Sequence, residues 1–236
     1  AAKAHRYLVS FQRLGLVTQD SASTRYDLGP AALRLGLASL SRIDAVRLAR
    51  ERIDALLPLT GHTLAIAVWG NQGPTMVHWT EAPQAVPVAL RLGDVMPLLS
   101  SATGRCFAAF MGDEGHDAQR VGPMIREELA RLKKLPRNGP LPLDLPTSMA
   151  EVQEMLDEVR RRGVARVVHS LQASVAGFGA PVFDVQGRMV LAMVVLGSVA
   201  TLDTDWDGGP ATALRDAARR LSADLGHRAA APRSDE

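Results

Sequence analysis

The chain begins Ala1-Ala-Lys-Ala-His-Arg-Tyr-Leu-Val-Ser-Phe-Gln-Arg-Leu-Gly-Leu-Val17, followed by Thr18-Gln-Asp-Ser-Ala-Ser-Thr-Arg-Tyr-Asp-Leu-Gly29. Tyr7, Leu8, Phe11 and Leu14 recur every three to four residues, which predicts a helix with one apolar face. Gly15 suits the end of that helix, because glycine takes a left-handed conformation without steric cost. The remaining residues alternate around a polar turn and predict a short two-stranded hairpin.

A basic helix followed by a hairpin is the order of elements in the C-terminal half of a winged helix-turn-helix. A generic amphipathic helix with a hairpin explains the same residues equally well. So small a unit cannot bury enough surface to fold alone. We therefore expect either that it docks on the rest of the chain or that earlier helices of the domain are missing from this sequence. The candidate DNA contacts are Lys3, His5, Arg6, Arg13 and Arg25. We assign Arg6, Arg13 and Arg25 to phosphates and leave base readout open, because the base-reading start of such a helix is largely absent.

Composition places few limits on function. The chain has 236 residues, of which 47% are hydrophobic and 22% charged, as in ordinary soluble proteins. Its net charge of +2 permits nucleic-acid contact through a local patch but does not require it. The single cysteine, Cys106, excludes an internal disulfide framework and suits a reducing cytoplasm. No apolar run reaches the roughly 18 residues needed to span a membrane, so we expect a cytoplasmic protein with no membrane partner.

After residue 44 the pattern alternates pairs of strands with helices, and the turns are too short for crossover connections. This favours an α+β fold with an antiparallel sheet. Glycine, proline and capping residues place the boundaries. The expected helices cover residues 31–43, 46–59, 100–111, 123–132, 149–162 and 211–225, and the expected strands cover 63–69, 75–80, 86–92, 164–169, 173–183 and 189–197. Residues 228–236 are expected to form a disordered tail.

Sequence motifs for catalysis or metal binding are absent. The six histidines are scattered without ligand spacing, so we expect no metal and no cofactor. Cys106 lies in an apolar helical segment and is predicted to be a buried small side chain rather than a nucleophile. An enzyme that uses Cys106 or Ser101 is the weakest reading of the sequence, and we expect no catalysis.

One helix start has the features of a small-molecule site. The helix beginning near Ser101 would offer free backbone N–H groups at Ala102, Thr103 and Gly104, which suit a carboxylate. The strands over 164–169, 173–183 and 189–197 would wall this site with apolar side chains, as in most ligand pockets. On physical grounds alone, an equally good interpretation is that the serines and threonine only cap the helix.

Several motifs, in order and at matching spacing, resemble the IclR family of bacterial transcriptional regulators. They are Arg25-Tyr-Asp-Leu-Gly-Pro30, Leu59-Thr-Gly-His-Thr-Leu-Ala-Ile-Ala-Val68, Arg91-Leu-Gly-Asp-Val-Met-Pro-Leu98 with Ala102-Thr-Gly-Arg105, and Gly179-Ala-Pro-Val-Phe-Asp-Val-Gln-Gly187. The resemblance implies a winged helix-turn-helix ending in residues 1–29, a linker helix over 30–44, and a GAF-like effector domain over 45–227 with a six-stranded antiparallel sheet. It also implies operator DNA and a small-molecule effector as partners, and homodimers or dimers of dimers.

The resemblance also implies an effector site and departures from it. Its expected residues are Val88, Ser101, Ala102, Thr103, Gly104, Val167, His169, Gly177, Val194 and Leu196. Family members that bind small polar acids carry an acidic residue at the position of Val167, cysteine at Gly177, and serines at Val194 and Leu196. The family's Gly-Lys pair is Gly104-Arg105 here. Because burying an unpartnered polar group costs about 1–3 kcal/mol, these changes predict a larger, hydrophobic or aromatic acid as effector.

The sequence therefore favours a ligand-responsive regulator of a catabolic operon. A GAF-like sensor or interaction module without a DNA role is the alternative. The helix over 31–43 is predicted to transmit the effector signal, with Leu35 and Leu37 as the residues to test.

Overall fold

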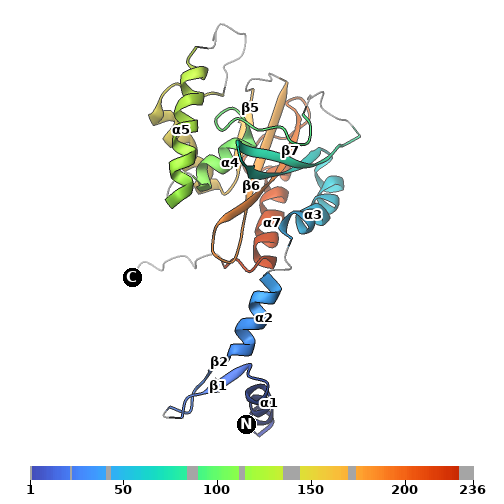
Figure 1. Cartoon of the computed structure of the whole chain (residues 1–236). Coiled ribbons are helices and arrows are strands. Elements are labelled where there is room, and N and C mark those ends of the chain that lie inside the picture. Colours follow the sequence, from blue (N-terminus) through green and yellow to red (C-terminus); the bar gives the residue numbers. More distant parts are fainter. Residues whose placement is uncertain are drawn as a thin grey trace, which may run out of the picture. The chain divides into compact units, whose positions relative to one another are not determined.

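The computed structural model describes residues 2–21, 23–40, 44–83, 90–111, 115–134, 144–169 and 174–228. The chain divides into two compact units, Ala1–Asp44 and Ala45–Glu236. The second unit begins one residue after the expected linker segment ends. Figure 1 shows the elements of both units.

The first unit is a helix, a hairpin and a second helix. Helix α1 covers Ala2–Arg13, strands β1 (Val17–Gln19) and β2 (Tyr26–Leu28) pair antiparallel, and α2 covers Pro30–Leu40. Gly15 ends α1 with a φ of 69°. Its carbonyl then accepts the amide of Ala31 at 2.9 Å. A Cβ on Gly29 would lie 2.2 Å from that carbonyl oxygen, so glycine at position 29 is required for the turn to pack.

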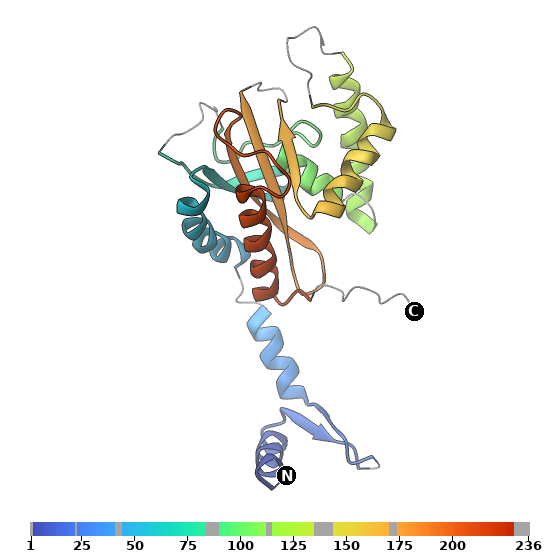
Figure 2. The ribbon, with the colours of Figure 1, turned by 180° about the vertical axis from the view of Figure 1, so that it is seen from behind.

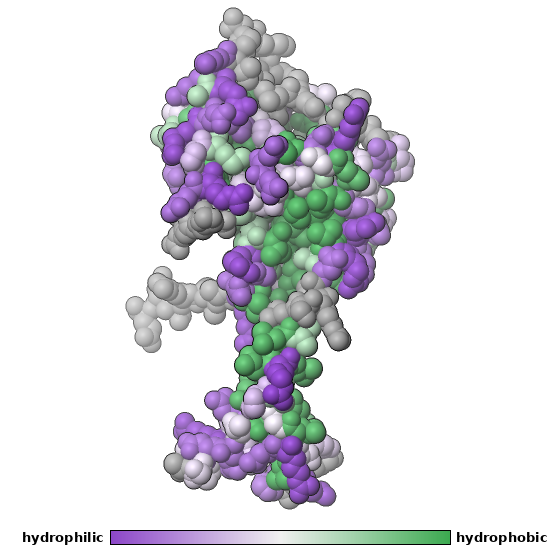
Figure 3. Space-filling view, viewed as in Figure 1, coloured by the Kyte–Doolittle hydropathy of each residue, from purple (hydrophilic) through white to green (hydrophobic). Residues whose placement is uncertain are grey.

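The apolar face predicted for α1 is present but exposed among the described residues. Tyr7 is 57% exposed, Phe11 41% and Leu14 66%. Helix α2 is exposed in the same way, since Leu33, Leu35 and Leu37 are 65%, 66% and 56% exposed. Figure 3 shows apolar surface in green along α2. This unit by itself therefore leaves two apolar helix faces unburied.

The second unit is built on a five-stranded antiparallel sheet in the order β4-β3-β7-β6-β5. The strands are β3 (Thr63–Gly70), β4 (Gly73–Thr80), β5 (Ala165–Val168), β6 (Val175–Phe183) and β7 (Met189–Ser198). The two longest strands, β6 and β7, are adjacent and almost wholly buried, as their unbroken apolar sequences predict. Their hairpin turns at Asp184–Arg188, where the Asp184 carboxylate accepts the amides of Gln186 and Arg188.

Helices cover the sheet on both faces, which gives two separate hydrophobic cores. Helices α3 (Ala45–Thr60) and α7 (Gly209–Asp224) pack on one face, together with Leu64, Ile66 and Phe178. Figure 2 shows both helices from that side. Helix α4 (Ala102–Met111) packs on the other face, where α5 (Gly115–Leu132) and α6 (Met149–Arg162) lie against it. The α+β class and the antiparallel sheet are therefore confirmed.

The sixth strand is not among the described residues. We expected a strand over residues 86–92, but 84–89 lie outside the described ranges and residues 90–92 are not in a strand. The chain nearby still contacts the sheet edge, because Val95 forms a single antiparallel bridge with Thr75 of β4. The expected tail, 228–236, lies almost wholly outside the described residues as well. Within the described parts of the chain, no helix is long and apolar enough to cross a membrane.

Candidate effector-binding site

Three neighbouring strands place the expected wall residues in one row. In the register of the sheet, Val167 of β5 pairs with Gly177 of β6, which in turn pairs with Leu196 of β7. Val194 lies two residues from Leu196 and therefore on the same face of β7. That face packs against α4, because Val194 and Leu196 belong to the same core as Cys106 and Phe107. The row of small and aliphatic residues thus faces the helix whose start we expected to bind a ligand.

Ser101 caps the start of α4. Its hydroxyl donates to the carbonyl of Pro97 at 2.7 Å and accepts the amide of Gly104 at 2.9 Å. The carbonyl of Ser101 accepts the amide of Arg105 at 2.9 Å. The expectation that the Gly104 amide is free was therefore wrong: the serine hydroxyl occupies it. The capping interpretation is correct for Ser101.

The next two residues, Ala102 and Thr103, have backbone amides without an acceptor among the described residues. No described residue accepts a hydrogen bond from the backbone amides of Ala102 or Thr103, or pairs with the Thr103 hydroxyl. Thr103 as a residue is only 2% exposed, and it lines the cavity described below, so its hydroxyl has no partner among the described residues but can meet a molecule in that cavity. The positive end of the helix dipole adds to these donors. The first turn of α4 therefore keeps hydrogen-bonding capacity for something outside the chain.

A buried carboxylate holds the segment that leads into α4. Glu128 of α5 accepts the amide of Leu98 at 2.6 Å, the amides of Leu99 and Ser100 at 3.1 and 3.2 Å, and the Ser100 hydroxyl at 3.1 Å. These are charge-assisted bonds from three consecutive backbone amides, a common way of holding an anion. Glu128 is 9% exposed. This group of amides is thus already filled by the chain's own carboxylate.

Arg105 ties α4 to the edge of the sheet. Its guanidinium donates to the carbonyl of Leu99 at 2.8 Å, to the carbonyl of Arg166 at 2.9 Å, and to both the carboxylate and the carbonyl of Asp144. Burial lowers the pKa of Arg105 below its ordinary value, and the charge of Asp144 partly offsets that shift. Arg105 is not among the residues that line the cavity described next. The arginine at the family's lysine position is thus a packing element here.

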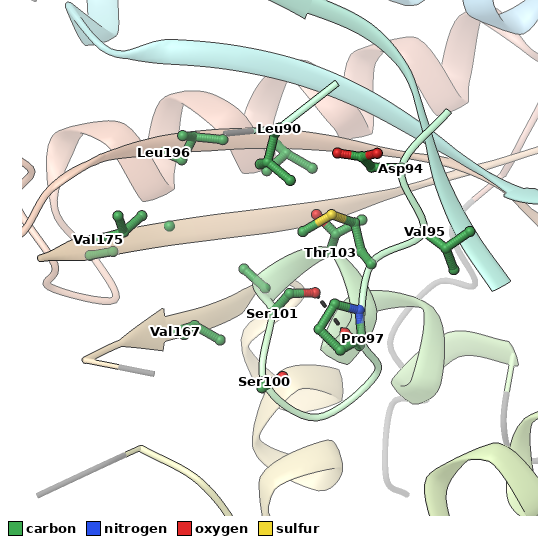
Figure 4. A pocket seen from close by; sticks show the side chains of 15 residues that line it. Leu90, Asp94, Val95, Pro97, Ser100, Ser101, Thr103, Val167, Val175 and Leu196 are labelled. Atoms are coloured by element: carbon green, nitrogen blue, oxygen red, sulfur yellow. Dashed lines mark hydrogen bonds between the residues drawn. The ribbon is translucent and has the colours of Figure 1, made fainter. Parts of the chain in front are cut away.

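A cavity of about 340 Å³ lies between the start of α4 and the row on the sheet. Figure 4 shows Ser101, just before α4, and Thr103, in its first turn, across the cavity from Val167, Val175 and Leu196 of the strands. Seven of the ten expected effector residues line it: Ser101, Ala102, Thr103, Val167, Gly177, Val194 and Leu196. Its volume is at the lower end of the range typical of small-molecule sites.

Three expected residues do not line the cavity as described. Gly104 is packed against the preceding segment, where an added Cβ would lie 1.8 Å from the Pro97 carbonyl oxygen. His169 lies beyond the end of β5 with a φ of 53°, and its carbonyl accepts the amide of Asp144. Val88 lies outside the described residues. The expected residues that do line the cavity therefore lie at the start of α4 and on the strands β5, β6 and β7.

Sequence reasoning missed a further wall of the cavity. Val175 and Ala176 also line the cavity, on the strand over 173–183 that was expected to wall it, whereas the unexpected lining residues are Leu90, Asp94, Val95, Met96, Pro97 and Ser100. These six belong to the segment before α4, which carries no periodic pattern that would indicate burial. The amides of Gly93 and Met96 bond to β4 at the carbonyls of Met76 and Pro74, and such long-range contacts bring the segment to the cavity. The sequence feature that could have pointed to these lining residues was the Arg91–Leu98 motif.

The catalytic alternative finds no support in the geometry. Cys106 is fully buried, and burial raises the pKa of its thiol well above the ordinary value. The Ser101 hydroxyl is engaged by Pro97 and Gly104, as a helix cap. In the described ranges, no group of three or more His, Cys, Asp and Glu side chains could hold a metal ion.

The expected DNA contacts lie on two elements of the first unit. His5, Arg6 and Arg13 are exposed on α1, and Arg25 is exposed next to β2. The side chain of Lys3 lies outside the described residues. The exposed cations are therefore available to an anionic partner, with Arg6 and Arg13 on the helix and Arg25 on the hairpin.

The chain belongs to the IclR family of bacterial transcriptional regulators. Residues 37–223 match the family described as bacterial transcriptional regulator IclR C-terminal. This region includes the cavity and both helical layers. Membership defines the class of protein as a ligand-responsive transcriptional regulator that is not an enzyme, and it supports binding of both DNA and an effector.

Individual relatives agree with this assignment. The chain is 33% identical to the glycerol operon regulatory protein of Streptomyces griseus over 94% of its own length and 83% of the relative's. It is also similar to the crystal structure of HmgR from Pseudomonas aeruginosa, with 33% identity, a TM-score of 0.82, and coverage of 96% and 85% of the two chains. The repressor BlcR of Agobacterium tumefaciens, at 21% identity and a TM-score of 0.75 over 97% and 85%, shares the fold.

Proposed function

We propose that the chain senses a hydrophobic or aromatic carboxylic acid in the cavity beside α4 and thereby controls transcription of a catabolic operon. The proposal rests on the difference between the two sides of the cavity, one apolar and one with hydrogen-bond donors. Its sheet wall is formed by Val167, Gly177, Val194 and Leu196, and the first turn of α4 supplies unpaired donors at Ala102 and Thr103. In an acid with an apolar body, the body matches the sheet wall and the carboxylate matches the donors of α4.

Small polar acids are poorer candidates for physical reasons. A polar group placed against the aliphatic row would lose its water and find no protein partner, at a cost of about 1–3 kcal/mol for each group. An apolar body instead gains from removing its surface and that of the row from water. The acid's carboxylate would accept hydrogen bonds from the amides of Ala102 and Thr103 and from the Thr103 hydroxyl, at the positive end of the helix dipole.

A thermal-shift screen tests the ligand class. We expect aromatic and aliphatic carboxylates to raise the melting temperature of the purified chain, because a ligand that binds the native state stabilises it. Glyoxylate should raise it little. Finding that only glyoxylate-sized acids stabilise the protein would overturn the proposed ligand class.

A double variant sharpens that test. Val194→Ser with Leu196→Ser would replace aliphatic wall residues by hydroxyls and should reverse the preference, weakening hydrophobic acids and improving glyoxylate. Val195→Ser is the matched control, since Val195 lies on the same strand but packs into the core on the opposite face of the sheet. It should lower stability without changing which acids bind.

On the DNA side, we propose that residues 1–29 are the C-terminal part of a winged helix-turn-helix and that Arg6, Arg13 and Arg25 contact phosphates. Replacing any of them by glutamine should weaken binding to all DNA sequences alike and reduce its salt dependence. In a gel-shift assay with the full-length protein, an interaction module without a DNA role would not retard its own promoter fragment, whereas a DNA-binding regulator would.

We further propose that α2 transmits the signal within a homodimer or a dimer of dimers. An effector that prefers one quaternary arrangement shifts the population toward it. Leu35 and Leu37 are exposed on α2, where a partner subunit could cover them. Leu35→Asp and Leu37→Asp should leave effector affinity in place while removing the effect of the ligand on operator binding. Retained coupling in both variants would contradict this role.

A further inference from the structure

Asp94 is a charged residue in a cavity that is otherwise neutral in its described lining. It follows Gly93 in the segment before α4, and Figure 4 shows it among the residues that line the same cavity as Thr103. The described lining residues include no lysine, arginine or histidine. Asp94 is therefore the one charged side chain in the described lining of the cavity.

Hydrogen bonds hold the backbone and one carboxylate oxygen of Asp94, and the other carboxylate oxygen has no donor among the described residues. The Asp94 carbonyl accepts the amide of Met76 at 3.0 Å, which anchors the backbone to β4. Carboxylate oxygen Oδ2 accepts the amide of Arg91 at 2.8 Å. No described residue donates to the other oxygen, Oδ1. The side chain is half-buried, so Oδ1 is available to a donor from outside the chain.

We propose that Asp94 selects effectors that carry a hydrogen-bond donor, a hydroxyl or an amino group, in addition to their carboxylate. This inference rests on the proposed function, because it concerns the same cavity and the same class of acid. Without such a donor, a ligand carboxylate at Ala102 and Thr103 shares a small cavity with the Asp94 carboxylate, and like charges repel. With a donor, Oδ1 gains a charge-assisted hydrogen bond and the repulsion is offset.

The geometry therefore points to a hydroxylated or aminated acid with an apolar body. The alternative role for Asp94 is structural, as the cap of the turn that begins at Arg91. The two roles differ in their response to Asp94→Asn. Asparagine keeps a carbonyl oxygen for the Arg91 amide, but replaces the free carboxylate oxygen by a donor and removes the charge.

The test uses the purified full chain and isothermal titration with matched acids. The probes are phenylacetate, its 2-, 3- and 4-hydroxy derivatives, mandelate and 4-aminophenylacetate. We expect at least one hydroxylated or aminated probe to bind the wild-type protein about tenfold more tightly than phenylacetate, the size of one added bond to a charged group. In Asp94→Asn that advantage should vanish, while phenylacetate itself should bind a few-fold more tightly because the repulsion is gone.

This crossover separates the outcomes. A structural cap would lower the affinity for all the probes together, or for none, and either result overturns the proposal. Equal binding of all the probes to the wild-type protein overturns it too. If no probe binds and no other apolar acid raises the melting temperature, the proposed function itself fails, and the inference fails with it. The unfolding midpoint of ligand-free Asp94→Asn reports any loss of folding separately.

Discussion

Two groups of backbone amides lie within six residues of each other at the start of α4, and their fates differ. The amides of Leu98, Leu99 and Ser100 are filled by the Glu128 carboxylate, whereas those of Ala102 and Thr103 have no partner among the described residues. Ser100, Ala102 and Thr103 all line the cavity, but the amides of the first group bond to α5, whereas those of the second group have no described partner. The same chemistry thus serves folding on one side and supplies ligand-binding capacity on the other.

The difference separates an anion that stabilises the fold, the Glu128 carboxylate, from one that would serve function, the carboxylate of a ligand. An internal carboxylate is always present, so its bonds contribute to the native state permanently. A ligand's carboxylate is present only when the ligand is, so its bonds make stability depend on ligand concentration. The substitutions below test this division, from the largest expected effect to the smallest.

Glu128→Ala should have the largest effect. It would leave three buried amides and the Ser100 hydroxyl without an acceptor, and each unsatisfied buried group costs about 1–3 kcal/mol. We expect a loss of about 4 kcal/mol in the free energy of unfolding of the second unit, measured by urea denaturation. Glu128→Gln, which keeps one acceptor oxygen and the shape, should lose about half as much. If the alanine variant unfolds at the wild-type urea concentration, the Glu128 bonds do not hold this segment.

Gly104→Ala is expected to rank second. An added Cβ would lie 1.8 Å from the Pro97 carbonyl oxygen and 2.5 Å from the Cα of Leu98, both backbone atoms. The segment must move, and we expect a loss of about 3 kcal/mol, the upper end for overpacking. Gly122→Ala in α5 is the matched control, because its Cβ would meet only the end of the Arg126 side chain, at 3.6 Å. That variant should change stability by less than ~1 kcal/mol, because the gain in helix propensity is offset by crowding of the new Cβ against Pro123, and similar losses for both variants would contradict the close approach.

Ser101→Ala should lower stability by about 1 kcal/mol, the usual effect of removing a helix cap. It frees the Gly104 amide, and the loss of both bonds of the hydroxyl should be visible as a lower urea midpoint. Ser101→Thr keeps the hydroxyl and should recover most of the difference. A large fall in ligand affinity, with stability unchanged, would show instead that Ser101 binds the ligand, as proposed for Ala102 and Thr103.

Thr103→Val should change stability least, by less than ~0.5 kcal/mol, because the hydroxyl that it removes has no protein partner. Its effect should appear on ligands. We expect the affinity for a bound acid to fall about tenfold in titration calorimetry, as expected for one bond to a charged group. Thr103→Ser, which keeps the hydroxyl, should bind nearly as the wild type does. Unchanged affinity in the valine variant would remove Thr103 from the site.

The sequence predicted most elements because they carry local signals. Helix α6 covers Met149–Arg162, as expected, with Ser148 as its cap and Gly163 in the left-handed conformation at its end. Strands β6 and β7 follow from continuous apolar runs. The segment before α4 carries no such signal, so neither the Glu128 bonds nor the place of Asp94 in the cavity was predicted. These depend on contacts between residues about 20 to 30 positions apart.

The sequence by itself determined the α+β class, a helix that begins near Ser101, and the apolar character of Val167, Val194 and Leu196. These follow from periodicity, capping residues and side-chain chemistry, which are properties of neighbouring residues. Only the tertiary structure decided which amides remain open. The Gly104 amide, predicted to be free, is taken by Ser101, and the amides of Leu98 to Ser100 are taken by a carboxylate from α5. A hydrogen bond needs both partners in place, and packing alone determines where the second partner lies.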